Sequence, residues 1–161
     1  MRTPTISIIT VNFNNNEGLK KTLRSIEVQS YTSYEHIIID ADSNDGSQET
    51  IKNYSEKNTH LTYWVSEKDK GIYDGMNKGI RQAKGEYLYF LNSGDCLQGN
   101  ILKDIPFDVT KYIYGDMVLV NDHEQRKEAG PDYPDLVFFF YNALAHQACF
   151  IHHSLFINKL Y

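Results

Sequence analysis

Residues 6–46 read ISIITVNFNNNEGLKKTLRSIEVQSYTSYEHIIIDADSNDG and hold two β-branched runs separated by an amphipathic segment. The runs at 6–11 and 35–40 are short and mostly apolar, which is typical of strands buried on both faces of a sheet. Between them, Leu19, Leu23 and Ile26 lie on one face of a helix expected over 17–30. Because two strands joined through a helix usually run parallel, this stretch predicts a β-α-β unit.

The same alternation continues to residue 91. We expect a helix over 47–57 with Ser47 as its N-cap, a strand over 61–65, a helix over 72–83 and a strand over 86–91. The third helix carries Ile72, Met76 and Ile80 at spacings of four, and Gly85 follows as its C-terminal stop. Strands that alternate with helices predict an α/β fold with a mostly parallel sheet and helices on both faces.

The last third of the sequence has a different pattern. Residues 111–120 and 126–129 flank a polar turn and predict a small antiparallel β element. A short helix is expected over 135–143 and a further strand over 148–151. At 161 residues, the chain is expected to form a single domain.

Composition and charge exclude several classes of protein. A net charge of −5, without a long cluster of Lys and Arg, argues against nucleic-acid binding. The longest apolar run, Leu136 to Tyr141, is far shorter than the about 20 residues of a membrane-spanning helix. The N-terminus lacks the pattern of a signal peptide, so a cytoplasmic location is expected. Cys96 and Cys149 are interpreted as reduced, packed thiols. Phe138, Phe139, Phe140 and Tyr141 are expected to form an exposed apolar patch. Such a patch would mark a contact with a partner, a second copy of the chain or a membrane surface, or the place where a missing segment packs.

Polar loops follow each of the first four predicted strands, at 12–16, 40–47, 66–71 and 92–95. In open α/β sheets, ligands bind outside the carboxyl ends of the strands, where these loops would meet. Any one of the loops is also explained by ordinary turn residues, but together they favour a binding site.

Three familiar loop motifs can be excluded. The loop at Asp40 resembles a calcium loop, but Gly46 stands at the seventh position instead of the sixth, and Ile51 replaces the last ligand. The glycine-rich fingerprints of dinucleotide-binding and P-loop proteins are both absent. A bound nucleotide would therefore be held by carboxylates and a metal ion.

Five segments, in this order, resemble the family 2 inverting glycosyltransferases of the GT-A fold, especially those of bacterial polysaccharide assembly. These segments are ISIITVNFNN, IIIDADSNDGS, SEKDKGIYDGMNKGIRQAKGEYLYFLNSGD, YGDMVL and AHQACFIHHSLF. The third is the most specific, and together they cover nearly the whole chain. The resemblance divides the chain into a nucleotide-binding half at 1–95 and a partial acceptor-side half at 96–161.

The resemblance implies transfer of a sugar from a nucleotide-diphospho-sugar, with UDP as the expected nucleotide, to a saccharide or lipid-linked acceptor. It implies a divalent cation, Mn²⁺ or Mg²⁺, held by Asp95 and acting as a Lewis acid on the leaving diphosphate. Asn92 and Gly94 stand where many relatives carry Asp, so we expect a water-rich coordination shell. The residues expected to bind the nucleotide-sugar are Val11, Asn12, Asn14, Asp40, Asp42, Lys70, Gly71, Asp74, Asn77, Asn92, Ser93 and Gly94.

The catalytic base is not identified. Inverting transfer needs a group that takes the acceptor proton, and in the family this is a carboxylate beyond the segment that contains His146. The sequence stops at Tyr161, so the base is expected beyond it, with His146 as a substitute candidate. The alternative interpretation is a nucleotide-sugar-binding module with little or no turnover.

Overall fold

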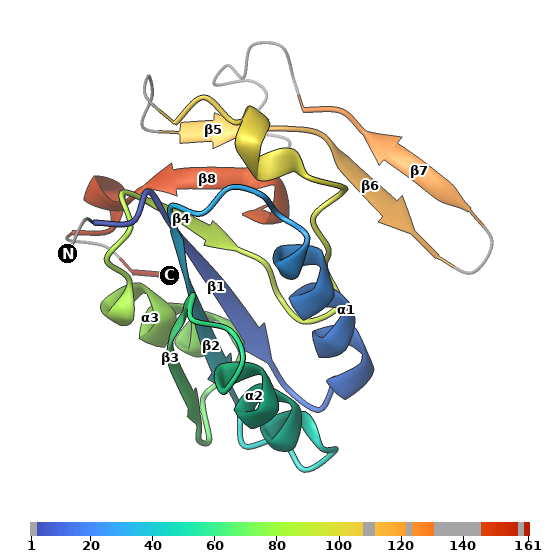
Figure 1. Cartoon of the computed structure of the whole chain (residues 1–161), viewed down its shortest axis with the longest axis vertical. Coiled ribbons are helices and arrows are strands. Elements are labelled where there is room, and N and C mark those ends of the chain that lie inside the picture. The colour runs from blue at the N-terminus through green and yellow to red at the C-terminus, as the bar shows by residue number, and fades with distance from the viewer. Residues whose placement is uncertain (1–2, 108–111, 122–123, 131–145, 158–159) are drawn as a thin grey trace.

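The computed structural model describes residues 3–107, 112–121, 124–130, 146–157 and 160–161 (Figure 1). Its main element is a six-stranded sheet with the strand order β3-β2-β1-β4-β8-β5. The strands of this sheet are β1 (Ile6–Asn12), β2 (Tyr34–Asp40), β3 (Leu61–Ser66), β4 (Tyr87–Phe90), β5 (Tyr112–Tyr114) and β8 (Cys149–His152). Strands β1 to β4 are parallel, whereas β8 is antiparallel to both β4 and β5. The predicted mostly parallel α/β sheet is confirmed.

In the described part of the chain, three α-helices cover the two faces of the sheet. They are α1 (Asn16–Glu27), α2 (Ser47–Ser55) and α3 (Ile72–Gln82). Leu19, Leu23 and Ile51 of α1 and α2 pack with Ile38 of β2, while Met76 of α3 packs with the other face. Every residue of β1, β2 and β4 is buried, which accounts for their nearly continuous apolar sequences.

Smaller elements complete the described chain. Strands β6 (Met117–Val120) and β7 (Gln125–Glu128) form a separate antiparallel ribbon that projects away from the main sheet (Figure 1). The 3₁₀ helices are η1 (Ile101–Asp104), η2 (His146–Ala148) and η3 (His153–Phe156). In the described residues, no helix is long and apolar enough to cross a bilayer. The helix expected at 135–143 and the aromatic patch at 138–141 lie outside the described residues.

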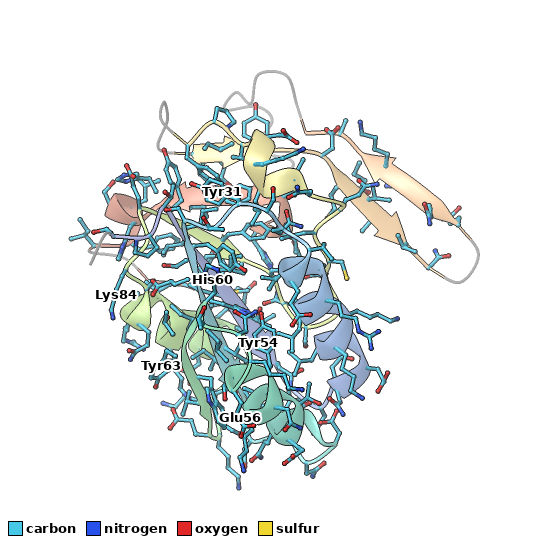
Figure 2. All side chains as sticks on the ribbon, viewed as in Figure 1. Tyr31, Tyr54, Glu56, His60, Tyr63 and Lys84 are labelled. Carbon is cyan, nitrogen blue, oxygen red and sulfur yellow. The ribbon has the colours of Figure 1, made fainter. Side chains whose placement is uncertain are left out.

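The turn between α2 and β3 is held by aromatic and amide contacts at the amino end of the sheet, away from the strand-end loops. His60 stacks on Tyr34 with ring centroids 4.2 Å apart, and Asn58 donates to the hydroxyl of Tyr54 at 2.7 Å. Tyr54 and His60 are both labelled in Figure 2. Both aromatic side chains therefore have structural partners.

The last third of the chain corrects one strand prediction. Residues 111–120 do not form one strand, because β5 pairs with β8 in the main sheet and β6 pairs with β7. The strand expected over 148–151 is confirmed as β8, shifted by one residue, and it inserts between β4 and β5.

Several predicted helix boundaries are also corrected: α1 ends at Glu27 instead of residue 30, and α2 ends at Ser55 instead of residue 57. Gly46, not Ser47, is the N-cap of α2, and the Asp45 carboxylate accepts bonds from both the backbone N–H and the hydroxyl of Ser47. Helix α3 already ends at Gln82, three residues before Gly85. A Cβ at Gly85 would lie 2.4 Å from the backbone nitrogen of Ser7, so this glycine allows close packing against β1.

One burial prediction is wrong, that of Cys96. Ile72, in the first turn of α3, is 46% exposed, whereas Met76 and Ile80 are buried. Cys149 is buried, but Cys96 is exposed in the loop after β4.

Candidate functional site at the carboxyl edge of the sheet

The carboxylate of Asp40 is fully buried and bonded at both oxygens. Asn12 stands opposite Asp40 in the register of β1 and β2, and its amide donates to the carboxylate at 2.6 Å. The hydroxyl of Ser43, its backbone N–H and the hydroxyl of Ser66 donate to the same carboxylate at 2.6, 2.9 and 2.6 Å. Because a carboxylate offers about four acceptor positions, protein donors already use this capacity. Asp40 therefore joins the ends of β1, β2 and β3.

The loops after β1 and β2 hold each other and present two exposed side chains. The side-chain oxygen of Asn14 accepts from the backbone N–H of Asn44 at 2.9 Å. The backbone N–H of Asn14 donates to the hydroxyl of Ser43 at 2.9 Å. Asn14 and Asp42 both have positive φ angles, 45° and 58°, a region in which Asn and Asp are enriched. Asp42 is exposed, and the Phe13 ring is 64% exposed. The rim of the site thus offers a carboxylate and an aromatic face.

The loop after β4 is a tight turn next to the first loop. The backbone N–H of Asp95 donates to the carbonyl of Asn92 at 3.0 Å, and Ser93 donates to the carbonyl of Val11 at 3.1 Å. The Asn15 amide donates to the carbonyl of Ser93 at 2.9 Å. Gly94 has a φ of 105°, a conformation in which a side chain is strained. The backbone of this turn therefore favours glycine at position 94.

Asp95 of this turn and His146 of η2 are the titratable side chains that influence each other here. Burial raises the pKa of Asp95, and the charge of His146 acts in the opposite direction. Burial lowers the pKa of His146, and the charge of Asp95 partly offsets that effect. The His146 ring lies 3.2 Å from the Asn92 amide nitrogen, while Asn92 Oδ1 is buried without a hydrogen-bond partner.

These side chains fit a divalent cation that phosphate oxygens help to coordinate. Asp95 supplies a carboxylate and Asn92 an unpartnered amide oxygen, which are oxygen ligands that suit Mg²⁺ or Mn²⁺. His146 Nε2 accepts from the Asn92 amide and orients its oxygen. Within the described residues, no group of three or more His, Cys, Asp or Glu side chains converges on one point. Mg²⁺ and similar ions commonly bind through one or two carboxylates together with substrate phosphates.

The β3–α3 loop forms the next side of the edge. The backbone N–H of Glu67 donates to the backbone carbonyl of Asp40 at 3.0 Å. The loop therefore begins next to the end of β2. Lys70 is exposed, and its backbone N–H donates to the Asp74 carboxylate at 3.1 Å. Gly71 caps α3 with a φ of 112°. Among the described residues, the side chains of Lys70 and Asp74 make no hydrogen bond to the turn after β4 and belong instead to the start of α3.

Asn77 lies on α3 and contacts the last residue of the chain. Its amide donates to the carbonyl of Tyr161 at 2.8 Å and accepts from the backbone N–H of Tyr161 at 2.9 Å. The Tyr161 ring packs against Phe90 and Tyr73 with centroids 5.4 and 5.8 Å away. Both polar groups of Asn77 are therefore engaged within the chain.

Several site residues were not predicted from the sequence. Ser43 follows Asp40 by three residues, and that spacing was an available signal, whereas nothing in the local sequence places Ser66 beside Asp40. Thr22 gave none, because it lies inside α1, yet its hydroxyl bonds the backbone of the turn after β4.

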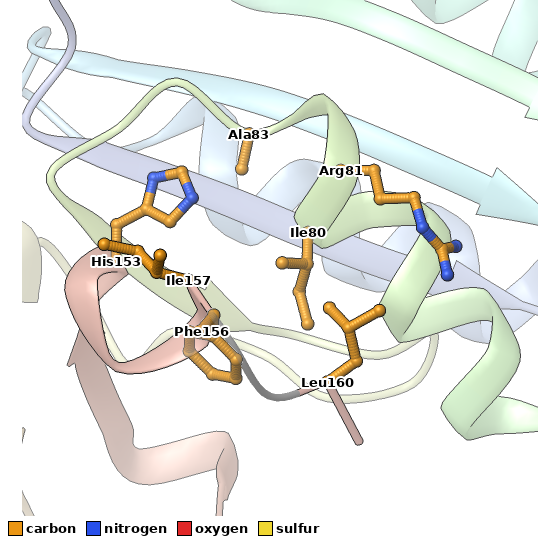
Figure 3. Close-up of a pocket in the computed structure, with 7 residues that line it drawn as sticks. All are labelled: Ile80, Arg81, Ala83, His153, Phe156, Ile157 and Leu160. Carbon is orange, nitrogen blue, oxygen red and sulfur yellow. The ribbon is translucent and has the colours of Figure 1, made fainter.

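A cavity of about 590 Å³ lies elsewhere, at the C-terminal end of α3 (Figure 3). Its lining residues are Ile80, Arg81, Ala83, His153, Phe156, Ile157 and Leu160. None of these is a predicted site residue, so the cavity is distinct from the strand-end site.

Comparison with known proteins identifies a family for this chain. The model of the family described as "Glycosyl transferase family 2" matches residues 7–106. An uncharacterized glycosyltransferase of Mycobacterium tuberculosis, Rv1514c, is 42% identical over 97 residues, which is 60% of this chain and 36% of the relative. A GalNAc(5)-diNAcBac-PP-undecaprenol beta-1,3-glucosyltransferase of Campylobacter jejuni is 26% identical over 129 residues, 78% of this chain and 42% of that protein.

A solved structure supports the fold. The mannosyltransferase PcManGT of Pyrobaculum calidifontis, in complex with GDP-Man and Mn²⁺, superposes with a TM-score of 0.56 at 21% identity. The match covers 62% of this chain and 30% of that one. The chain thus spans well under half the length of the relatives named here. Since the family model covers residues 7–106 of the 161, the chain belongs to glycosyl transferase family 2.

Proposed function

We propose that this chain forms the donor-binding part of an inverting transferase that moves a sugar from a nucleotide-diphospho-sugar to a saccharide or lipid-linked acceptor. The names of relatives support the acceptor class. The Campylobacter jejuni enzyme acts on a sugar chain linked to undecaprenol through a diphosphate, and its match covers 78% of this chain. Polysaccharide or other cell-surface glycan synthesis is the process that fits such acceptors.

The observation that carries the proposal is the convergence of the strand-end loops. Asn12, Asp40 and Ser66 are joined by hydrogen bonds, and Val11 is bonded to the turn that carries Asp95. This arrangement gives one edge with an outward carboxylate at Asp42 and an aromatic face at Phe13. A nucleoside offers the complementary groups, namely hydroxyls for the carboxylate and a flat base for the ring.

Within this site, we assign different roles to Asp40 and Asp42. The buried Asp40 carboxylate positions Asn12 and the loop after β2, since it already accepts bonds from protein donors. The exposed Asp42 carboxylate receives hydrogen bonds from the nucleoside. The backbone of Val11 and the loop residues Asn14 and Ser93 complete this side.

The diphosphate side is assigned to the turn after β4. Asp95, with Asn92 and His146 beside it, would hold Mn²⁺ or Mg²⁺, which supplies Lewis-acid stabilisation of the leaving diphosphate when bound. Gly94 keeps the turn tight. Placing His146 with Asp95 assigns it to the donor side, so it is not our candidate for the base. Lys70 is free to approach a phosphate, with Gly71 and Asp74 shaping that loop.

Calorimetric titration of UDP and GDP, each with and without Mn²⁺, tests the donor site. We expect one nucleoside diphosphate to bind, with higher affinity when Mn²⁺ is present. A panel of the matching sugar nucleotides and of free and lipid-linked saccharide acceptors then tests transfer. Failure of both nucleotides to bind would overturn the proposal, whereas binding without transfer to any acceptor would favour a binding module.

A further inference from the structure

We propose that the Thr22 hydroxyl on α1 is a positioning group for the cation site, because it fixes the turn that carries Asp95. The inference rests on the proposed function, in which Asp95 holds the cation. Thr22 lies about 70 residues before this turn in the sequence and belongs to no predicted motif.

The hydroxyl contacts the backbone at both ends of the turn, Asn92 and Asp95. Its oxygen lies 2.8 Å from the carbonyl of Asp95, 3.1 Å from the carbonyl of Gly18 in α1 and 3.3 Å from the carbonyl of Asn92. The three carbonyls compete for its single proton, and the contact with Asp95 is the shortest. The backbone N–H of Gly94 donates to the same oxygen at 3.0 Å. A hydroxyl has one proton and two lone pairs, so Thr22 can donate to Asp95 while accepting from Gly94.

Thr22 is rigidly held. Its side chain is fully buried, and the neighbouring Leu23 and Ile26 on α1 are in the core beneath it. The packing of α1 therefore fixes the position of the Thr22 hydroxyl, and the hydroxyl in turn fixes the backbone of the turn. Binding geometry at a metal centre has to be held to within about 0.5 Å by such supporting groups, and Asp95 has no side-chain hydrogen bond among those described that could do this instead.

Three variants separate positioning from a general loss of packing. Thr22→Val keeps the shape of the side chain and removes the hydroxyl, whereas Thr22→Ser restores the hydroxyl without the methyl group. Thr50→Val is the matched control, since the Thr50 hydroxyl on α2 bonds the Asn16 side chain at 2.7 Å, away from the turn.

The readout is the ratio of UDP or GDP affinity with Mn²⁺ to affinity without it, together with the electron paramagnetic resonance signal of protein-bound Mn²⁺. We expect Thr22→Val to lower the ratio about tenfold, which corresponds to about 1.4 kcal/mol, with metal-free affinity unchanged. Thr22→Ser should recover most of the ratio, and Thr50→Val should leave it at the original value.

The outcomes distinguish this inference from the proposed function. A normal ratio in Thr22→Val, together with a lost ratio in Asp95→Ala, would overturn the role of Thr22 alone. An equal decrease of the affinity ratio in Thr22→Val and Thr50→Val would also overturn it, because the decrease would then reflect a general loss of packing. An unmodified chain that gains no affinity from Mn²⁺ would overturn the cation site and the role of Thr22 together.

Discussion

The amide of Asn12 donates to the carboxylate of Asp40 at 2.6 Å, across the register that pairs the last residues of β1 and β2. Both side chains are buried, at 1% and 0% exposure. A charged group that is buried this deeply is stabilised only when its oxygens are bonded. The pair therefore fixes where the two strands end and where their loops begin.

Replacing Asp40 tests its role as a positioning group. Asp40→Asn places an NH₂ group where donors already point, and leaving buried donors unpaired costs about 1–3 kcal/mol. We expect a lower free energy of unfolding in urea and weaker nucleotide binding even without metal. Binding that weakens with no change in unfolding would instead indicate direct contact with the nucleotide.

Asp42→Asn is the matched comparison. Its carboxylate is exposed, so the free energy of unfolding should stay within about 0.5 kcal/mol of the original value. Metal-free UDP or GDP affinity should fall, since the charged acceptor for the nucleoside hydroxyls is lost. Unchanged affinity in a calorimetric titration would remove Asp42 from the site.

Phe13 provides a test of base stacking. The ring is 64% exposed and lies in the loop next to Asn14, so Phe13→Ala should cost little stability. Stacking of a base on an aromatic ring contributes about 1–3 kcal/mol, and we expect a loss of nucleotide affinity of that order. Phe13→Tyr should retain the affinity, and an equal loss in both variants would argue against stacking.

The buried His36 predicts how stability depends on pH. Burial lowers its pKa to about 3, so below the ordinary value of about 6.5 the unfolded chain binds a proton that the folded chain does not. The contribution of His36 to the free energy of unfolding is fully present above pH 6.5. It falls as the pH drops toward 3, by at most about 1.4 kcal/mol per pH unit.

Urea unfolding of the original chain and of His36→Leu, at several pH values between 7 and 4, measures this contribution. The free energy of unfolding should fall more steeply with decreasing pH in the original chain. Parallel curves for the two proteins would show that His36 does not contribute to the acid sensitivity. The comparison depends on slopes, so the absolute stability of the variant does not affect it.

The repeated strands and helices before residue 91 could be predicted because their signals are local. The β-branched runs at 6–11 and 35–40 and the helical spacing of Leu19, Leu23 and Ile26 each lie within one element. The insertion of β8 between β4 and β5 could not be predicted in this way, because it depends on pairing between residues about 60 positions apart.

The same distinction applies to the site. The meeting of the strand-end loops could be predicted from the topology, because the carboxyl ends of parallel strands lie at the same edge of the sheet. The burial of the Asp40 carboxylate depends on Ser66, 26 residues away, and the support of the Asp95 turn depends on Thr22. Neither contact leaves a pattern in the local sequence.

The most direct test of the donor site is the Mn²⁺ dependence of nucleoside diphosphate binding in Asp95→Ala, with Asp104→Ala as a control at an exposed carboxylate in η1. UDP and GDP would be titrated into each protein with and without Mn²⁺. We predict that Asp95→Ala loses at least about tenfold in Mn²⁺-dependent affinity, or about 1.4 kcal/mol, while Asp104→Ala is unaffected. Full Mn²⁺ dependence in Asp95→Ala would contradict the assignment and show that the cation binds elsewhere.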